Sequence, residues 1–305
     1  RSAPVVAIVM VSAAAGCDRP DPRGGLEVDA FGPTLLPEVR RAALMVPGEL
    51  PRSLGVISVS TFERSAATVA EGAPDEMVPA VRAAYQVRFP DSWIMVDAGF
   101  GPEFDPRGLT PGPELYAHLQ EALRGARLIV FTHEHLDHVG GAVRSPYLVD
   151  LEENMLLTQA QRTSLIREMP ESLIRLEPEV AARFVAIDYD PLMPIAPGVV
   201  LIKAPGHTPG SQIIYVRLDS GEEVLFAGDI SGLWSAVERG QQKPPRPDLF
   251  EDRDAIADQM AWLLEVSRQG PRILLAHDGA ALQALIDAGV MQPDVDLAAQ
   301  PPVTR

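Results

Sequence analysis

Four residues of the types that bind metal ions lie within six positions, directly after a short apolar run. The run RLIVFT at 127–132 has the length and β-branched content of a buried strand. The next segment, HEHLDH, contributes three imidazoles and a carboxylate: His133, His135, Asp137 and His138. At a strand end, a loop with this spacing can direct all four side chains into one small volume without helical geometry. The imidazoles would repel one another on protonation, so the segment predicts a bound metal ion rather than a solvated loop.

Two further histidines extend this pattern. His207 and His277 also follow predicted strands, at positions where an α/β scaffold presents side chains to a ligand. The sixth histidine, His118, falls inside a predicted helix, where we expect a surface or packing role. The chain contains one cysteine, Cys17, so no thiolate is present in the globular part. The metal site is therefore expected to use His and carboxylate ligands, which suits zinc, iron or manganese.

Strand and helix patterns alternate along most of the chain. Helices are predicted at 111–126, in parts of 142–185, around Ile256–Leu264 and from Ala280 onward. Strands are predicted at 55–63, 84–89, 92–99, 127–132, 184–187, 199–204, 212–218, 223–228 and 272–276. This order predicts two packed β-sheets with helices outside, in one domain at 54–305. The Pro-rich, weakly patterned residues 17–53 are expected to form a tether and a lead-in loop.

The charge of the chain bears on its partners. The formal net charge is −16, from 26 basic and 42 acidic residues. Nucleic-acid binding depends on Lys and Arg side chains that neutralise phosphates, and the sequence has no basic run. We therefore expect a small-molecule substrate and no nucleic-acid partner.

The N-terminal segment has the pattern of an export signal. The apolar run VVAIVMV at 5–11 is too short to span a bilayer, and small residues follow it up to Cys17. The sequence AAGC at 14–17 resembles a bacterial lipobox, in which the cysteine is lipidated. We expect a signal peptide at 1–16 and an exported, periplasmic bacterial protein anchored at Cys17, with Asp18 favouring the inner membrane. A buried first strand with an incidental cysteine is the alternative.

The segment THEHLDHVGG at 132–141 resembles the H-x-H-x-D-H metal motif of the metallo-β-lactamase superfamily. The other motifs of that family follow in order. DAG at 97–99 is similar to its early D-x-G motif, and APGHTPGS at 204–211 to its second histidine loop. FAGD at 226–229 is similar to the strand that ends in a bridging aspartate, and LAHD at 275–278 to the last histidine loop. The resemblance covers roughly residues 55–280 and implies an αββα sandwich of the α+β class.

The resemblance also implies a role for each matched residue. The implied ligands of the first ion are His133, His135 and His207, those of the second are Asp137, His138 and His277, and Asp229 bridges both. Asp97 would contact a ligand residue rather than the metal ion itself. Gly206, Gly210 and Gly228 would let the backbone turn tightly beside the ligands. Two divalent ions, expected to be zinc with iron or manganese as alternatives, would lower the pKa of a bridging water and supply hydroxide. Asp137 or Asp229 would take the proton.

The implied function is a binuclear metal-dependent hydrolase that cleaves a small ester or lactone. The bridging aspartate favours the lactonases, the glyoxalase II-like thioesterases and the phosphotriesterases, and the sequence lacks the cysteine ligand of zinc β-lactamases. A mono-iron sulfur dioxygenase and a non-catalytic metal-binding domain at a membrane are the alternatives from other classes. A flavodiiron protein is disfavoured, since it would carry Glu in place of His135.

One position departs from the lactonase pattern. Acyl-homoserine lactonases carry a tyrosine three residues after the bridging aspartate, where it helps to polarise the substrate carbonyl, and this chain has Gly232 there. Another donor, or the metal alone, must then supply that help. Near the motifs, Asp278 is expected to orient a neighbouring group, whereas Glu134 and Ser231 are candidates to line the pocket. Trp234, in a loop predicted at 230–250, is a candidate pocket wall, and 142–185 is either a lid or a set of core helices.

Overall fold

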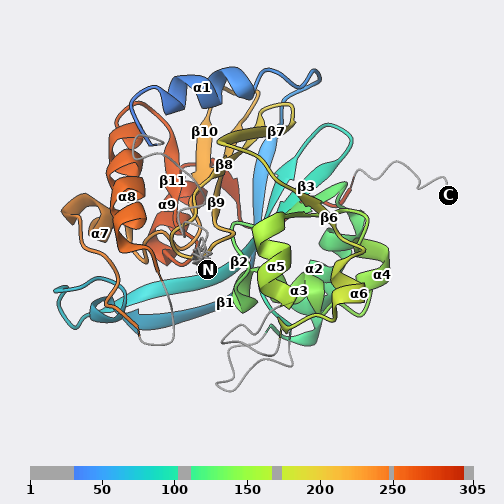
Figure 1. Cartoon of the computed structure of the whole chain (residues 1–305), viewed down its shortest axis with the longest axis horizontal. Coiled ribbons are helices and arrows are strands. Elements are labelled where there is room, and N and C mark those ends of the chain that lie inside the picture. The colour runs from blue at the N-terminus through green and yellow to red at the C-terminus, as the bar shows by residue number, and fades with distance from the viewer. Residues whose placement is uncertain (1–30, 102–110, 167–173, 247–250, 299–305) are drawn as a thin grey trace, which may run out of the picture.

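The computed structural model describes residues 31–101, 111–166, 174–246 and 251–298. These residues form two β-sheets that pack together, with helices on the outer surfaces (Figure 1). The αββα sandwich predicted from the sequence is confirmed. The predicted signal segment 1–16, together with Cys17 and Asp18, lies outside the described residues.

The larger sheet has seven strands in the order β12-β1-β2-β3-β4-β5-β6. The strands β1, β2 and β3 pair antiparallel, and the pairs from β3 to β6 are parallel. A short turn that contains Pro90 and Asp91 joins β2 to β3. Its strands are β1 (Ser53–Ser65), β2 (Met77–Arg88), β3 (Trp93–Val96), β4 (Leu128–Val130), β5 (Met155–Thr158), β6 (Val185–Ile187) and β12 (Met291–Gln292).

The smaller sheet has five strands in the order β11-β10-β9-β8-β7. The first four in chain order form an antiparallel meander, and β11 returns parallel to β10. As a result β8, β10 and β11 all end at the same edge of the sheet. Its strands are β7 (Leu192–Ala196), β8 (Val199–Lys203), β9 (Gln212–Arg217), β10 (Glu223–Phe226) and β11 (Arg272–Leu274).

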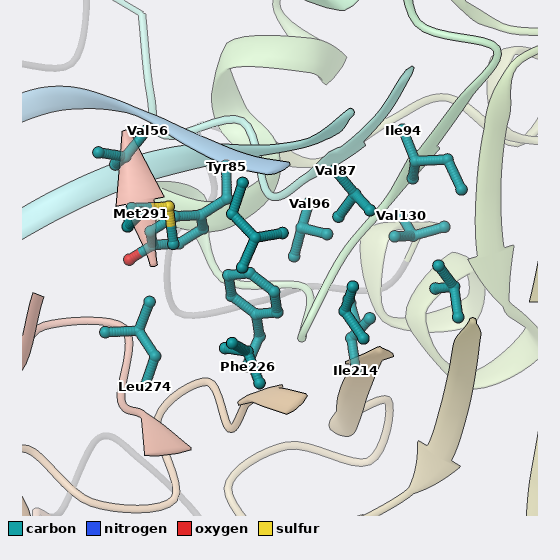
Figure 2. Packing of buried hydrophobic residues seen from close by; sticks show 14 of the residues in the cluster. Val56, Tyr85, Val87, Ile94, Val96, Val130, Ile214, Phe226, Leu274 and Met291 are labelled. Carbon is teal, nitrogen blue, oxygen red and sulfur yellow. The ribbon is translucent and has the colours of Figure 1, made fainter. Parts of the chain in front are cut away.

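Alternating apolar residues of both sheets form the central core (Figure 2). On β2, every second side chain from Val81 to Val87 faces the other sheet, as the period of a strand requires. The rings of Tyr85 and Phe226 meet across the interface, with their centroids 5.0 Å apart. Complete burial of side chains of this size contributes about 1.5–3 kcal/mol each, so this layer holds the two sheets together.

Each sheet carries helices on its outer face (Figure 1). Apolar residues of α2, α3 and α5 pack on the seven-stranded sheet, and those of α1 and α8 pack on the five-stranded sheet. No described helix is both long and apolar enough to cross a bilayer. The helical elements are α1 (Leu35–Ala42), η1 (Ala66–Thr68), α2 (Pro113–Gly125), α3 (Leu136–Val143), α4 (Leu148–Leu151), α5 (Gln159–Ile166), α6 (Pro178–Ala181), α7 (Trp234–Arg239), α8 (Arg253–Ser267) and α9 (Gly279–Asp287).

Helix α1 lies within the predicted tether, so that prediction is wrong for residues 35–42. Leu35, Leu36, Val39 and Ala42 are buried against the five-stranded sheet. A helix of eight residues has little stability by itself, and packing of its apolar face supplies what the local sequence does not. The folded part of the chain therefore begins well before residue 54.

Further elements, among them β5, β7 and α7, differ from the sequence predictions. Leu156 and Leu157 lie in the segment with predicted helices but belong to β5. A four-residue apolar run fits a helix or a strand, and here its pairing with β4 and β6 makes it a strand. β7 was not predicted, since it contains Pro194; as an edge strand it tolerates the missing N–H. Helix α7 lies in the loop predicted at 230–250. In the described part of 142–185, Leu165 and Ile174 are fully buried, which favours core helices over a lid.

Candidate metal centre

The seven predicted ligands come together where strands of both sheets end. The segment 133–138 follows β4, His207 lies between β8 and β9, and Asp229 and His277 follow β10 and β11. The two sheets are joined at this edge, since the backbone N–H of Gln212 donates to the carbonyl of Thr132 at 2.8 Å. The carboxyl ends of strands place these loops side by side, as expected for a ligand site in an α/β scaffold.

The first cluster consists of three buried imidazoles, those of His133, His135 and His207. The Nδ1 atom of His135 lies 3.2 Å from His133 Nε2 and 3.1 Å from His207 Nε2. Three ring nitrogens therefore converge on one point away from water. Such a trio is the arrangement that holds a divalent ion in many zinc sites.

The second cluster consists of Asp137, His138 and His277. His277 Nε2 lies 3.3 Å from Asp137 Oδ2 and 3.3 Å from Asp229 Oδ1. Asp229 faces both clusters, because its Oδ1 is 3.7 Å from His138 Nε2 while its Oδ2 is 3.6 Å from His207 Nε2. The two oxygens of one carboxylate thus point to two separate groups of ligands, which is the geometry of a bridge.

Unsatisfied polar atoms test whether metal ions fit this site. His138 Nε2 and Asp229 Oδ1 are both buried, and neither has a hydrogen-bond partner in the described part of the chain. A buried polar group without a partner costs about 1–3 kcal/mol, and more if it is charged. Divalent ions in the two clusters would satisfy both atoms, so the donor set fits a two-metal centre.

The backbone around the second cluster is helical, contrary to the sequence analysis. His135 is the N-cap of α3, and Asp137 and His138 lie in its first turn. A loop with this spacing had been expected to gather the ligands without helical geometry. Instead, the start of a helix directs the two side chains, and the carboxylate of Asp137 gains from the positive end of the helix dipole.

Each of three histidines is oriented by a hydrogen bond at its far nitrogen. Asp97, at φ +59°, accepts from Thr132 N at 2.7 Å and lies 2.8 Å from His138 Nδ1. His277 Nδ1 lies 2.8 Å from the carbonyl oxygen of Val81. With Nδ1 donating in both rings, Nε2 is the nitrogen that faces the centre and that would bind a metal ion once it is deprotonated. The supporting position predicted for Asp97 therefore agrees with the structure.

The third oriented histidine depends on two residues that the sequence analysis missed. His207 Nδ1 lies 2.5 Å from Glu251 Oε1, and Lys243 Nζ lies 2.9 Å from the same oxygen. Lys243 also donates to the carbonyl of Asp229 at 2.7 Å. Burial acts to raise the pKa of Glu251, but His207 and Lys243 lower it to about 2. Nothing in the sequence pattern marks this pair, since Glu251 is 44 residues away from the histidine it contacts.

Two arginines of the β1–β2 hairpin were also missed. Arg82 Nε donates to Asp137 Oδ2 at 3.1 Å. Arg64 Nη2 donates to the carbonyl of Gly232 at 2.9 Å and lies 3.4 Å from that of His277. The end of the hairpin extends past the sandwich near α7 (Figure 1), and apolar residues of the two segments pack together.

The metal-free centre has opposing charges in direct contact. Burial and the neighbouring imidazoles lower the pKa of His133 well below its ordinary value, which keeps this ring neutral. Burial acts to lower the pKa of His277, but Asp229 and Asp137 raise it to about 10. Conversely, burial acts to raise the pKa of Asp229, but the charge of His277 holds it well below its usual value. At neutral pH the carboxylates are ionised and a proton on His277 sits where a metal ion would bind.

At three glycines near the centre, neighbouring atoms leave too little space for a Cβ. Gly228 has φ +54°, and a Cβ there would lie 3.0 Å from Thr132 Cβ. A Cβ at Gly210 would lie 2.5 Å from the side chains of Gln161 and Glu134. Gly232, where lactonases carry tyrosine, has the Cβ of Val69 only 2.5 Å from where its own would be. The backbone at 232 therefore leaves no room for any side chain.

The remaining candidates have varied roles. Glu134 does not line a pocket: it is fully buried and accepts hydrogen bonds from Thr208 Oγ1 at 2.7 Å and Gly210 N at 3.2 Å. Ser231 is also buried and donates to the carbonyl of Leu233. Both side chains thus fix loops rather than face a substrate.

Asp278 orients its neighbours, as expected, since it caps α9 and accepts from Trp234 N at 2.7 Å. Trp234 lines a cavity of about 310 Å³ between the hairpin end, α7 and α9, but none of the seven predicted ligands is among the residues that line it. Its predicted place in the wall of the substrate pocket therefore stays a prediction. His118 lies outside the centre and pairs with the exposed Asp294 at 2.9 Å.

Comparison with known proteins identifies the family. The model of the metallo-beta-lactamase superfamily matches residues 79–277, which include every predicted ligand. The chain belongs to the metallo-β-lactamase superfamily. The resemblance inferred from the H-x-H-x-D-H motif is thereby confirmed.

The sequence relatives within this superfamily are lactonases. The N-acyl homoserine lactonase AiiA of Bacillus thuringiensis subsp. kurstaki is 30% identical over 155 residues, which are 49% of this chain and 55% of the relative. An N-acyl homoserine lactonase of a Bacillus species is 27% identical over 153 residues, with the same shares covered. The chain thus matches about half the length of these curated relatives.

Solved structures share the fold. A quorum-quenching N-acyl homoserine lactone lactonase has a TM-score of 0.61 and 18% identity, with 78% of this chain and 97% of that chain covered. AidC, described as a dizinc quorum-quenching lactonase, has a TM-score of 0.54 and 17% identity, with 75% and 90% covered. At these identities the likeness is one of fold, and it agrees with the two-sheet sandwich described above.

Proposed function

We propose that the protein is a binuclear metal-dependent hydrolase that cleaves a small ester or lactone. The observation that carries the proposal is the position of Asp229, whose two oxygens face two different ligand clusters. We assign His133, His135 and His207 to one ion, Asp137, His138 and His277 to the other, and Asp229 to both.

The relatives support the lactone as the substrate class. The relatives matched by sequence are named N-acyl homoserine lactonases. One structural neighbour is a lactone hydrolase described with the product N-hexanoyl-L-homoserine at its catalytic metal center. An ester, a thioester or a phosphotriester would use the same arrangement of ligands and remains part of the test below.

The residues of the chain divide the work of hydrolysis. Two divalent ions, for which the dizinc neighbour AidC favours zinc, would supply a hydroxide nucleophile near neutral pH and a Lewis acid for the carbonyl. Hydrogen bonds at Nδ1 keep three histidines in the tautomer that binds a metal ion through Nε2. Asp97 holds His138, Glu251 holds His207 and the carbonyl of Val81 holds His277. Asp137 or Asp229, both ionised at neutral pH, accepts the proton of the nucleophile. His138 and His207 are buried, so bulk water is excluded on their side of the centre.

The second cluster argues against a mono-iron sulfur dioxygenase. A one-metal enzyme has no use for a second set of buried ligands, and this chain brings Asp137, His138 and His277 together with the bridging carboxylate. Metal analysis separates the two functions, since the dioxygenase requires one iron per chain.

The test combines metal content with a panel of substrates. Protein loaded with zinc is assayed on a lactone, an aryl ester, a thioester and a phosphotriester, and its metal content is measured by mass spectrometry. We expect two ions per chain and turnover of the lactone or the ester. Asp229→Ala and His138→Ala should lower metal content and rate together, while His118→Ala, outside the centre, should change neither. Full loading without turnover of any of the four substrates would contradict the proposal.

We further propose that the protein is exported and anchored to a bacterial membrane through lipidated Cys17. The proposal rests on the lipobox-like segment at 14–17. Expressed in a bacterium from a gene that supplies a start codon, the wild-type chain should fractionate with membranes, and Cys17→Ser should release it. Equal release of both chains on cell lysis would contradict the anchor.

A further inference from the structure

We propose that Arg82 donates hydrogen bonds to the substrate carbonyl oxygen. Acyl-homoserine lactonases use a tyrosine for this, at the position where this chain has Gly232. This inference rests on the proposed hydrolysis and adds a residue to it. The same guanidinium would also bind the carboxylate that forms when an ester or lactone is cleaved.

Three described cationic side chains contact the centre, and Arg82 is the one with several N–H donors left for a ligand. Lys243 is already bonded to Glu251 and to the carbonyl of Asp229, on the side of His207 away from the ligands. Arg64 is bonded to two backbone carbonyls. Arg82 uses its Nε–H for Asp137, and its terminal nitrogens have no hydrogen-bond partner in the described part of the chain. A guanidinium carries five N–H donors in one plane, so four remain for a ligand.

The position of Arg82 is at the open side of the centre. Its side chain is 24% exposed and that of its partner Asp137 is 27% exposed, against 2% for His138 and 3% for His207. A substrate therefore reaches the centre past Asp137 and the guanidinium. Asp137 Oδ2 is in turn 3.3 Å from His277 Nε2, so only one carboxylate separates Arg82 from the second cluster.

Two aromatic rings fix the plane of this guanidinium. The Cζ atom of Arg82 lies 4.5 Å from the ring centroid of Phe62 and 5.4 Å from that of Phe100. The salt bridge and these rings hold the donors in one orientation before a substrate arrives. A donor that is already oriented stabilises developing charge without reorganisation at the moment of reaction.

The chemistry needs such a donor. When hydroxide adds to the carbonyl carbon, the C=O π bond breaks and the electron pair moves to the oxygen, which becomes an oxyanion. The oxyanion then collapses and the bond to the leaving oxygen breaks. The proton of the added hydroxide passes by way of Asp137 or Asp229 to the leaving oxygen, so that an alcohol and a carboxylate remain. Arg82 faces negative oxygen in both states. If Arg82 served only to orient Asp137, its loss would instead lower the affinity of the centre for zinc.

The experiment uses the zinc-loaded full chain with Arg82→Ala and Arg82→Lys, and Arg268→Ala as a matched control. Arg268 is exposed at the end of α8, and its guanidinium pairs with Glu265 at 3.3 Å. For Arg82→Ala we expect unchanged zinc content, kcat lowered about 100-fold, which is the usual effect of losing one oxyanion donor, and a smaller change in KM. Millimolar guanidinium chloride should restore part of kcat in Arg82→Ala, and Arg82→Lys should retain an intermediate kcat.

A binding measurement separates this inference from the proposed function. Calorimetry with 6-hydroxyhexanoate, the ring-opened product of a seven-membered lactone, should show binding about tenfold weaker to Arg82→Ala than to the wild type. If the wild type cleaves no substrate, the proposed function fails while this binding still tests Arg82. Wild-type kcat and product binding in Arg82→Ala, or loss of zinc without rescue by guanidinium, would overturn the role of Arg82 as the carbonyl donor.

Discussion

The proposed ligand His207 illustrates how single residues prepare this centre. Its Nδ1 faces the carboxylate of Glu251, which Lys243 neutralises from the other side. This leaves Nε2 directed toward His135 and Asp229. A carboxylate behind a histidine ligand fixes the tautomer and makes the ring a better donor to a metal.

Glu251→Gln should therefore weaken zinc binding without unfolding the protein. The amide keeps the shape of the side chain but loses the charge, and we expect zinc affinity to fall about 10–100-fold. Titration against a competing chelator measures the effect. Glu265→Gln, on an exposed part of α8, is the control and should bind zinc like the wild type. Equal affinity in Glu251→Gln and the control would show that Glu251 has no supporting role.

His277 should make zinc binding dependent on pH. Its pKa is raised from 6.5 to about 10 in the metal-free centre by Asp229 and Asp137, against the effect of burial. A raised pKa means that the imidazolium stabilises the metal-free fold below pH 6.5 and that this contribution disappears as the pH rises toward 10. Zinc must displace this proton, so zinc affinity should rise with pH across that window, by about tenfold per unit for one released proton.

Calorimetry in buffers of different ionisation enthalpy counts the proton directly. We expect at least one proton, that of His277, to be released as zinc binds at neutral pH, and a second when the bridging water ionises. His118→Gln should leave that count unchanged, since His118 lies outside the centre. Zinc binding that neither releases a proton nor depends on pH would contradict the charge arrangement described for the metal-free site.

At the scale of elements, the sequence predicted which side chains converge better than it predicted the backbone that carries them. His133, His207 and His277 were recognisable because their residue type restricts the chemistry and because apolar runs precede them. The start of α3 at Leu136 was not recognisable, since the four ligand residues obscure any helical period. Arg82 and Glu251 carry no local signal at all, because only the folded chain brings them to the centre. Tertiary packing decides such positions, and a linear pattern does not contain it.

Helix α1 provides a prediction about the extent of the domain. Leu36 is 1% exposed against the five-stranded sheet, whereas Leu44, just after the helix, is 63% exposed. Leu36→Ala should lower the free energy of unfolding by about 2–5 kcal/mol, the usual effect of such a cavity. Leu44→Ala should change it by less than about 0.5 kcal/mol. Denaturant unfolding compares the two, and similar values would mean that α1 is a tether rather than part of the core.

At the scale of the whole molecule, the proposed metal centre lies where the two sheets of the sandwich meet. Ligands after β4 belong to the seven-stranded sheet, while those after β8, β10 and β11 belong to the five-stranded sheet. Metal ions would therefore connect the sheets at an edge where, without them, His138 and Asp229 leave buried atoms unpaired. Stability and metal loading should change together.

Removal of metal should lower the melting temperature of the whole domain. A ligand that binds only the folded state stabilises it by about 2.7 kcal/mol at a hundredfold excess over Kd. Chelator-treated protein should melt below the zinc-loaded protein in a single transition, and added zinc should reverse the shift. Asp229→Ala should show a smaller response to zinc. A melting temperature that does not respond to zinc in the wild type would contradict the coupling of the two sheets through the centre.

The central claim is that this fold builds two adjacent metal sites that share Asp229. Anomalous diffraction at the zinc edge, on crystals of the zinc-loaded chain, tests it most directly. The account predicts two anomalous peaks, one among His133, His135 and His207 and one among Asp137, His138 and His277, with the carboxylate of Asp229 between them. A single peak, or two peaks at other residues, would contradict it.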